Sequence, residues 1–521
     1  MSVSYDYEHQ DGLGLAALLA ARETSSAELI EEAIRRLDRV NGVLGGVVHP
    51  LFGQARAACG GVFGAPFQGV PFLLKDLHLA YPGAPLRSGS RLFDRHVPTA
   101  ESELVARFRR AGLNVFGKSA TPEFGLTPAT EPELHGPCRN PWNLQLSPGG
   151  SSGGAAAMVA AGVVPLASAS DGGGSIRIPA SCCGLFGLKP SRGRTPSGPE
   201  TPDIWHGFIA EHAITRSVRD SAALLDAVEG TYPAQLIHAL PAGGSFLDAT
   251  LQPAGRLRVA WSVDAALGRA LDPACRDAVL ETVALLTDLG HHCEEISLPI
   301  EREQFIVDFT TLLAGELGAV LRDGVRHLGR AVRHRDLELR TWGLGRLAEA
   351  FTAGDAAAAR WSLQQFARRW LLVMAPYDVL LTSTLGSLPL PVGALRPTPL
   401  ERLQLRLLDL PPMARLATRR NFLIDNGARI YDFASQTMPA NVTGQPSMSV
   451  PLHWTRSSIP VGMMFTGRPG DERTLFRLAA QLEQARPWAN RRPPVWSRDP
   501  LEHDPSYELA RRAQQAGAGS D

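Results

Sequence analysis

Lysine is the residue that this sequence most clearly lacks. Of its 52 basic residues only Lys75, Lys118 and Lys189 are lysines, and the rest are arginines. An arginine cannot lose its proton in a protein, whereas a lysine removed from water can do so near neutral pH. Because all three lysines lie close to two glycine-rich segments, we predict that at least one of them acts as a base.

The chain has no excess of charge and no long apolar run. Its 52 acidic residues balance the 52 basic ones, so nothing favours a nucleic acid or an acidic membrane as partner. The least polar run, residues 155–169, is interrupted by Pro165 and is too short to span a bilayer. The first twelve residues include acids and lack the apolar core of a signal peptide. We therefore expect a cytoplasmic protein with neither a membrane nor a nucleic-acid partner.

Cysteine is also scarce and is not grouped. The six cysteines lack the paired spacing of a metal site, and two that are adjacent in sequence make a poor structural bridge. We expect reduced, mostly buried thiols, no metal and no other cofactor. The six are Cys59, Cys138, Cys182, Cys183, Cys275 and Cys293.

Glycine and serine are concentrated in one stretch, residues 147–190. It begins S-P-G-G-S-S-G-G, continues through an alanine-rich segment typical of a helix and a short strand, and reaches D-G-G-G-S at Asp171 to Ser175. Glycine lets the backbone turn several N–H groups toward one point, and a serine among such groups is well placed to attack a carbonyl. The stretch therefore predicts acyl transfer.

Two short motifs suggest other chemistry but stand in the wrong context. Gly112 to Ser119 fits the phosphate loop G-x-x-x-x-G-K-[ST], yet a helix precedes it and its middle residues are apolar and strand-like. Gly150 to Gly154 fits the nucleophile elbow G-x-S-x-G, yet the preceding residues 145–149 form a turn where an elbow needs a strand. An esterase-like α/β-hydrolase using Ser152 remains as an alternative.

Periodicity predicts the elements around these motifs. Ser25 and Glu28 form a capping box before an amphipathic helix. The apolar run at 70–74 reads as a buried strand that delivers Lys75, either as a desolvated base or as a structural ion pair with Asp76. Residues 439–451 read as a loop entering a strand. We expect packing helices at 13–40, a core at 60–230, a cap of amphipathic helices at 300–375 and a C-terminal extension at 491–521.

Several separated motifs together resemble the amidase signature family. They are G-G-S-S-G-G, D-x-G-G-S-I-R-I-P-A-S-x-C-G-L-x-G-L-K-P, the upstream G-V-P-F-L-L-K-D, R-S-V-R-D at 216–220, and the late N-V-T-G-Q-P. The resemblance covers residues 13–487. It implies an α/β fold, a single domain over residues 1–490, and a large mixed, mostly parallel sheet covered by helices on both faces. The segment E-P-E-L-H-G-P-C-R-N-P-W-N-L at 131–144 looks most like the hydrolases of aminohexanoate cyclic dimers.

Family knowledge, carried over by motif position, implies a Ser-Ser-Lys triad. Ser175 would be the nucleophile, Ser151 the bridging serine reached through a cis peptide, and Lys75 the base. The N–H groups of Gly172, Gly173, Gly174 and Ser175 would form the oxyanion hole. Apart from the resemblance, Asp171 and Arg177 flank Ser175, and we expect them to pair and support the loop together with Ser152. We expect Lys118 and Lys189 to be structural, because unpaired buried lysines are rare.

The resemblance leaves the substrate open. Position 172 is glycine where threonine is common, and Ala120 stands where asparagine is usual, so the pocket wall differs from the family pattern. The leading prediction is hydrolysis of an amide, cyclic oligoamide or carbamate in a hydrophobic small molecule through an acyl-enzyme. Alternatives are a carbamate or aryl-acylamide hydrolase and the glutaminase subunit of a tRNA-dependent amidotransferase. The protein could act as a homodimer, and the sequence does not determine its oligomeric state.

Overall fold

The computed structural model describes residues 7–60, 64–199 and 203–497. Eleven strands of this part of the chain form one sheet in the order β1-β3-β2-β4-β6-β5-β10-β11-β9-β7-β8. The strands are β1 Val47–Pro50, β2 Pro71–Lys75, β3 Asn114–Ser119, β4 Leu166–Asp171, β5 Phe186–Lys189, β6 Ala210–Thr215, β7 Arg258–Trp261, β8 His292–Glu295, β9 Val379–Ser383, β10 Ser447–Trp454 and β11 Pro460–Gly467.

The helices can be divided into three groups. The N-terminal group is α2 Gly12–Ala20, α3 Ser26–Leu44, α4 Phe52–Ala57 and α5 Glu103–Arg110. The group that packs around the central strands is α6 Gly153–Ala160, α7 Arg177–Cys183, α8 Ile204–Gly207, α9 Val218–Val228, α10 Phe246–Thr250, α11 Pro273–Asp288, α18 Met438–Thr443 and α19 Glu472–Ala485. The third group is α12 Arg302–Leu328, α13 Leu339–Ala350, α14 Ala353–Met374, α15 Pro399–Leu407, α16 Pro411–Ala417 and α17 Arg420–Phe433. Single 3-10 turns are η1 Arg91–Phe93, η2 Glu123–Gly125 and η3 His334–Asp336.

The sheet is mixed, as predicted, but it is not mostly parallel. In the described sheet four neighbouring pairs are parallel and six are antiparallel. The prediction of a mainly parallel sheet is therefore wrong. One reason is that short connections, such as residues 455–459 between β10 and β11, can join only antiparallel neighbours.

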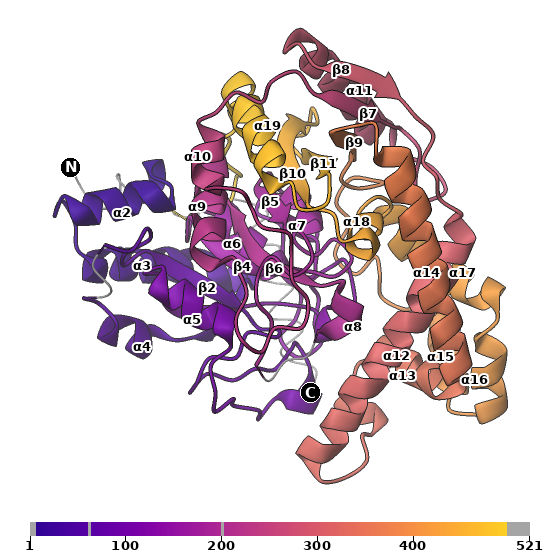
Figure 1. Ribbon diagram of the computed structural model, residues 1–521. Coiled ribbons are helices and arrows are strands. Elements are labelled where there is room, and N and C mark those ends of the chain that lie inside the picture. The colour runs from indigo at the N-terminus through magenta and orange to yellow at the C-terminus, as the bar shows by residue number, and fades with distance from the viewer. Residues whose placement is uncertain (1–6, 61–63, 200–202, 498–521) are drawn as a thin grey trace.

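Helices cover both faces of the sheet, which confirms that prediction. On β10, Met448 and Val450 pack into an apolar cluster with α9, α10, α11 and α19. Ser449 points to the opposite face, where Gly462 of β11 lies between it and Ser181 of α7. Side chains alternate along a strand, so α7 and α19 lie on opposite faces. Figure 1 shows the third helical group, coloured salmon to orange, beside this layered core.

Several local predictions are confirmed, and one is wrong. The capping box at Ser25 and Glu28 begins α3, and Asn114–Ser119 forms the strand β3, not a phosphate loop. Met438–Thr443, expected to be a loop, is the short helix α18. Among the described residues, α12 is the one helix long and apolar enough to cross a membrane, but the core helices of soluble proteins meet the same test. Most of the expected extension at 491–521 lies outside the described residues.

Candidate active site

Lys75 ends β2 inside the molecule. Its side chain is fully buried, and its Nζ lies 2.7 Å from Ser151 Oγ and 2.8 Å from Ser170 Oγ. Burial lowers the pKa of Lys75 from 10.5 to about 7, although the negative charges of Glu211 and Asp171 act to raise it. The lysine is therefore an amine that can gain and lose a proton near neutral pH.

The alternative of a structural pair between Lys75 and Asp76 is not what the structure shows. Asp76 turns toward residue 87, whose N–H donates to its Oδ1 at 3.2 Å, and no ion pair joins Asp76 to Lys75 within the described ranges. Instead, two serines of β4 hold the lysine. Ser168 Oγ accepts from the Lys75 N–H at 2.7 Å, and Ser170 Oγ accepts from Nζ.

Ser151 lies in the turn before α6 and is buried. The peptide bond between Gly150 and Ser151 is cis, as the resemblance led us to expect. The neighbouring Ser152 is fully buried, and its hydroxyl donates to the carbonyl of Ser170 at 3.3 Å. No strand precedes Ser152 in this described loop, so the geometry of a nucleophile elbow is not formed.

Ser175 lies in the turn between β4 and α7 and is partly exposed at the wall of a cavity. The N–H of Ser152 donates to the Ser175 carbonyl at 3.3 Å and ties the two glycine-rich loops together. Lys75 and Ser151 are thus in direct contact, and Ser175 lies on the adjoining loop. No hydrogen bond joins the Ser175 and Ser151 hydroxyls in this described region.

The four N–H groups predicted to form an oxyanion hole differ in their hydrogen bonding. The Gly174 N–H donates to Asp171 Oδ1 at 2.7 Å and is already engaged. The buried carboxylate turns that N–H inward, so Gly174 is not among the donors that are free to bind another group. The N–H groups of Gly172, Gly173 and Ser175 make no hydrogen bond to any other described residue, so three candidate donors remain.

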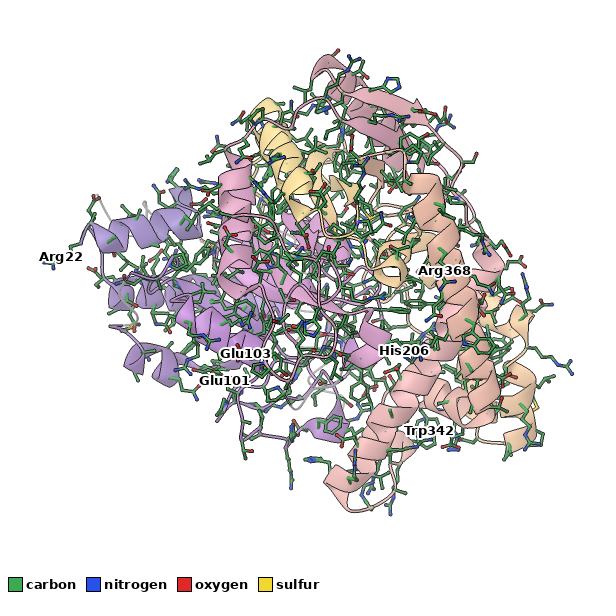
Figure 2. All side chains as sticks on the ribbon, viewed as in Figure 1. Arg22, Glu101, Glu103, His206, Trp342 and Arg368 are labelled. Atoms are coloured by element: carbon green, nitrogen blue, oxygen red, sulfur yellow. The ribbon has the colours of Figure 1, made fainter. Side chains whose placement is uncertain are left out.

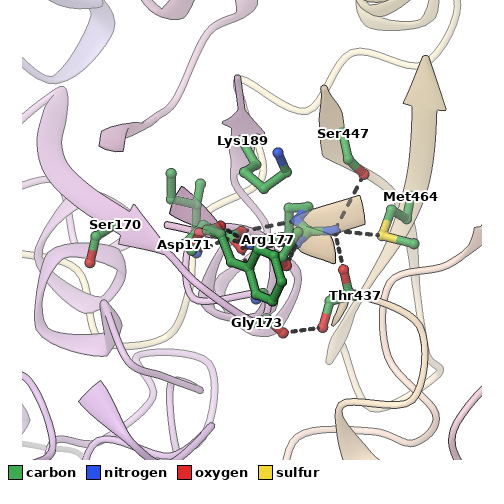
Figure 3. Close-up of polar contacts among 12 residues, drawn as sticks. Ser170, Asp171, Gly173, Arg177, Lys189, Thr437, Ser447 and Met464 are labelled. Atoms are coloured by element: carbon green, nitrogen blue, oxygen red, sulfur yellow. Dashed lines mark hydrogen bonds and ion pairs between the residues drawn. The ribbon is translucent and has the colours of Figure 1, made fainter. Parts of the chain in front are cut away.

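A buried ion pair supports this loop. Arg177 Nη2 lies 2.8 Å from Asp171 Oδ1, and both side chains are fully buried, which confirms the predicted pairing. Arg177 also donates to the Thr437 carbonyl and to Asn441 Oδ1, each at 2.8 Å. Thr437 Oγ1 in turn donates to the Gly173 carbonyl at 2.6 Å, as Figure 3 shows. The glycine-rich loop that carries Ser175 is therefore held by residues more than 250 positions later in the chain.

The charge state of this pair follows from its partners. Burial alone raises the pKa of Asp171, but the charge and hydrogen bonds of Arg177, with Lys189 and Asn441, lower it to about 2. Asp171 is therefore ionised throughout the neutral range. It serves as a fixed acceptor for the loop N–H groups.

The cavity beside Ser175 has a volume of about 210 Å³. The loop residues Gly173 and Ser175 form part of its wall, and the rest comes mainly from apolar side chains of α8, α12, α13, α15 and α17. Such a lining suits a hydrophobic substrate. The apolar and aromatic residues include Ile178, Trp205, Phe309, Leu344, Leu347, Tyr431 and Met438.

The other two lysines are buried but lie outside this arrangement. Lys118 Nζ donates to the Leu79 carbonyl and Lys189 Nζ to the Pro190 carbonyl, each at 2.8 Å. Burial lowers the pKa of Lys189 to about 7, with Arg177 adding to the effect. Both amines thus donate to backbone carbonyls among the described residues, whereas Lys75 contacts two serine hydroxyls. Within the described ranges, no group of three His, Cys, Asp or Glu side chains could hold a metal ion.

Sequence reasoning missed Ser170 and the distant residues Thr437 and Asn441. Ser170 could have been found from the pattern A-S-A-S-D in a buried strand, because a buried hydroxyl needs a partner. Thr437 and Asn441 lie far away in sequence and carry no comparable local signal. Trp205 was missed for the same reason.

Comparison with known protein families identifies the family of this chain. The amidase family model matches residues 28–476. The chain belongs to the amidase signature family and is an enzyme that hydrolyses carbon–nitrogen bonds of the amide type.

Individual proteins of this family are similar to the chain over nearly its whole length. The chain is 36% identical over 494 residues to 6-aminohexanoate-cyclic-dimer hydrolase from Pseudomonas sp. (strain NK87), covering 93% of this chain and 96% of the relative. It is 36% identical over 481 residues to the amidase AmiC of Mycobacterium tuberculosis, covering 92% and 95%. The solved structure of 6-aminohexanoate cyclic dimer hydrolase with substrate matches at TM-score 0.84 and 33% identity, covering 94% of this chain and 99% of that one. A bacterial aryl acylamidase matches at TM-score 0.79 but only 22% identity, which shows the fold alone.

Proposed function

We propose that the protein hydrolyses an amide bond in a hydrophobic small molecule through an acyl-enzyme on Ser175. The contact between Lys75 Nζ and Ser151 Oγ, 2.7 Å long and fully buried, is the observation that carries the proposal. A serine hydroxyl is a weak nucleophile until a neighbouring base takes its proton. Lys75, with a pKa of about 7, is such a base at neutral pH.

In the proposed reaction, Ser175 Oγ attacks the carbonyl carbon and forms a C–O bond. Its proton passes to Ser151 Oγ as Ser151 gives its own proton to Lys75 Nζ. The C–N bond then breaks, and the proton returns through Ser151 to the leaving nitrogen. Water, activated through the same serine and lysine, hydrolyses the ester and restores Ser175.

The N–H groups of Gly172, Gly173 and Ser175 are proposed to stabilise the oxyanion, because they have no other partner among the described residues. Ionised Asp171 and Arg177 hold these groups in place. In this proposal the Ser175 hydroxyl, which is on a partly exposed side chain, turns toward Ser151 to transfer its proton.

The proposed substrate is a cyclic or linear oligoamide of straight-chain units. The apolar cavity supports this choice, and so does the similarity to enzymes named for the 6-aminohexanoate cyclic dimer. Aryl amides and carbamates are the competing substrates within the same chemistry. We place the reaction in the cytoplasm and propose that it needs no cofactor.

Trapping the acyl-enzyme tests the proposal. The purified protein is treated with p-nitrophenyl hexanoate, quenched in acid, digested and analysed by mass spectrometry. We expect a hexanoyl group on the peptide that contains Ser175 and none in Ser175→Ala. Acylation of Ser152 instead would refute the assignment. A parallel screen of cyclic oligoamide, aryl amide and carbamate, with Ser175→Ala as blank, identifies the substrate class.

A further inference from the structure

The indole ring of Trp205 packs directly against the backbone of Gly172. A Cβ added to Gly172 would lie 2.8 Å from Cζ3 of Trp205, closer than side chains approach. The indole of Trp205 therefore fills the space in which a larger residue at position 172 would stand. Trp205 also lines the cavity beside Ser175.

The backbone under Trp205 is held in an unusual conformation. Trp205 and His206 are consecutive residues in the left-handed region, with φ of 55° and 54°. Such residues persist only where the surroundings fix them, and they are concentrated at functional sites. Here Glu316 of α12 accepts from the Trp205 N–H at 3.1 Å and lies 3.6 Å from His206 Nε2. Figure 1 shows α8 next to α12, and Figure 2 labels His206 in this region.

Aromatic packing fixes the ring from the other side. The Trp205 and Phe309 rings are 6.2 Å apart and nearly perpendicular, at 88°, a favoured edge-to-face arrangement. Phe309 is itself stacked against Phe208 and Phe305. The indole is therefore a rigid wall between the glycine loop and α12.

We propose that Trp205 is a specificity-determining residue that closes the cavity beside the scissile carbonyl and restricts the enzyme to unbranched acyl groups. The inference rests on the proposed function, in which the Gly172 N–H binds the carbonyl oxygen. A ring packed on Gly172 then lies next to the carbonyl and the first carbon of the acyl chain. A branch on that carbon would need the space that the indole fills.

The test compares two anilides that differ by one methyl group, hexanoyl-p-nitroanilide and 2-methylhexanoyl-p-nitroanilide. We expect the wild type to prefer the straight chain by about tenfold or more in kcat/KM, and Trp205→Ala to lose most of this preference. Trp205→Leu is made as well, in case the alanine variant does not fold. Trp361→Ala, which removes a tryptophan that is 68% exposed, is the matched control and keeps the wild-type ratio.

A second measurement does not need activity. Gly172→Ala should lower the melting temperature when it is made in the wild type. The same change should lower the melting temperature clearly less in Trp205→Ala, because the indole that the added Cβ would meet is absent. Gly173→Ala is the uncoupled control, since its Cβ would meet its nearest neighbour, Met438, at 3.5 Å.

The outcomes separate the two proposals. An unchanged substrate ratio in both Trp205 variants, with Ser175→Ala inactive, overturns the inference and leaves the proposed function intact. The absence of coupling between Gly172→Ala and Trp205→Ala overturns it independently. Activity in Ser175→Ala overturns the proposed function instead.

Discussion

The pH dependence of the reaction follows from the burial of Lys75. With a pKa of about 7, the neutral amine rises from roughly a tenth of the enzyme at pH 6 to nearly all of it at pH 9, so kcat/KM should rise about tenfold and then level off. An exposed lysine with an ordinary pKa would give a rise of roughly a thousandfold over the same range. Initial rates on hexanoyl-p-nitroanilide in buffers of constant ionic strength measure this curve.

Two variants show whether this profile belongs to Lys75. Lys75→Arg keeps a positive charge but cannot accept a proton, and it should lose a factor of roughly 10² to 10⁴ in kcat/KM. Lys118→Met is the matched control, because Lys118 is equally buried on the neighbouring strand β3 but donates to a backbone carbonyl. It should lose stability yet keep the wild-type pH profile. A flat profile from pH 6 to 9, or a folded and active Lys75→Arg, would refute the reasoning.

Four further predictions concern the two glycine-rich loops that carry Ser175 and Ser152. Asp171→Asn should lower the free energy of unfolding by about 3 to 5 kcal/mol in urea titration, because it leaves Arg177 buried without its partner charge. Asp323→Asn in an exposed pair is the control and should change it by at most about 1 kcal/mol. The pKa of Asp171 falls from 3.8 to about 2 on folding. Its ionisation therefore contributes about 2 kcal/mol to the free energy of unfolding above pH 3.8, and this contribution is lost as the pH falls toward 2. Acid titration of the wild type and of Asp171→Asn measures this difference. Gly174→Ala should destabilise by about 3 kcal/mol, since φ is 126° and the added Cβ would meet Thr437 Oγ1 at 2.3 Å; equal melting temperatures for Gly174→Ala and Gly173→Ala would contradict this. Ser152→Ala should keep measurable kcat/KM, because Ser152 is not the proposed nucleophile. Complete loss of activity in Ser152→Ala would favour Ser152 as the nucleophile.

The sequence allowed the local parts of the site to be predicted, because each carries a short-range signal. The apolar run before Lys75 predicted a buried strand, and the glycine clusters predicted tight loops around Ser151 and Ser175. The pairing of Asp171 with Arg177 follows from their spacing on one loop. These predictions depend on residues that are close together along the chain.

The errors arose where distant segments meet. The Gly174 N–H group is the exception, because the carboxylate that captures it lies only three residues earlier, and the prediction did not include this local bond. The antiparallel insertion of β5 and β6 into the sheet depends on pairing with β4 and β10, which periodicity does not report. Trp205 reaches Gly172 through a left-handed turn that tryptophan rarely adopts.

All three lysines of the described chain are buried. Reagents that attack ε-amines, such as activated esters used for dyes, cross-linkers and resin attachment, therefore meet no side-chain target on the native surface. Labelling of lysine side chains would therefore report unfolding, and immobilisation of the active enzyme could use its many carboxylate groups instead.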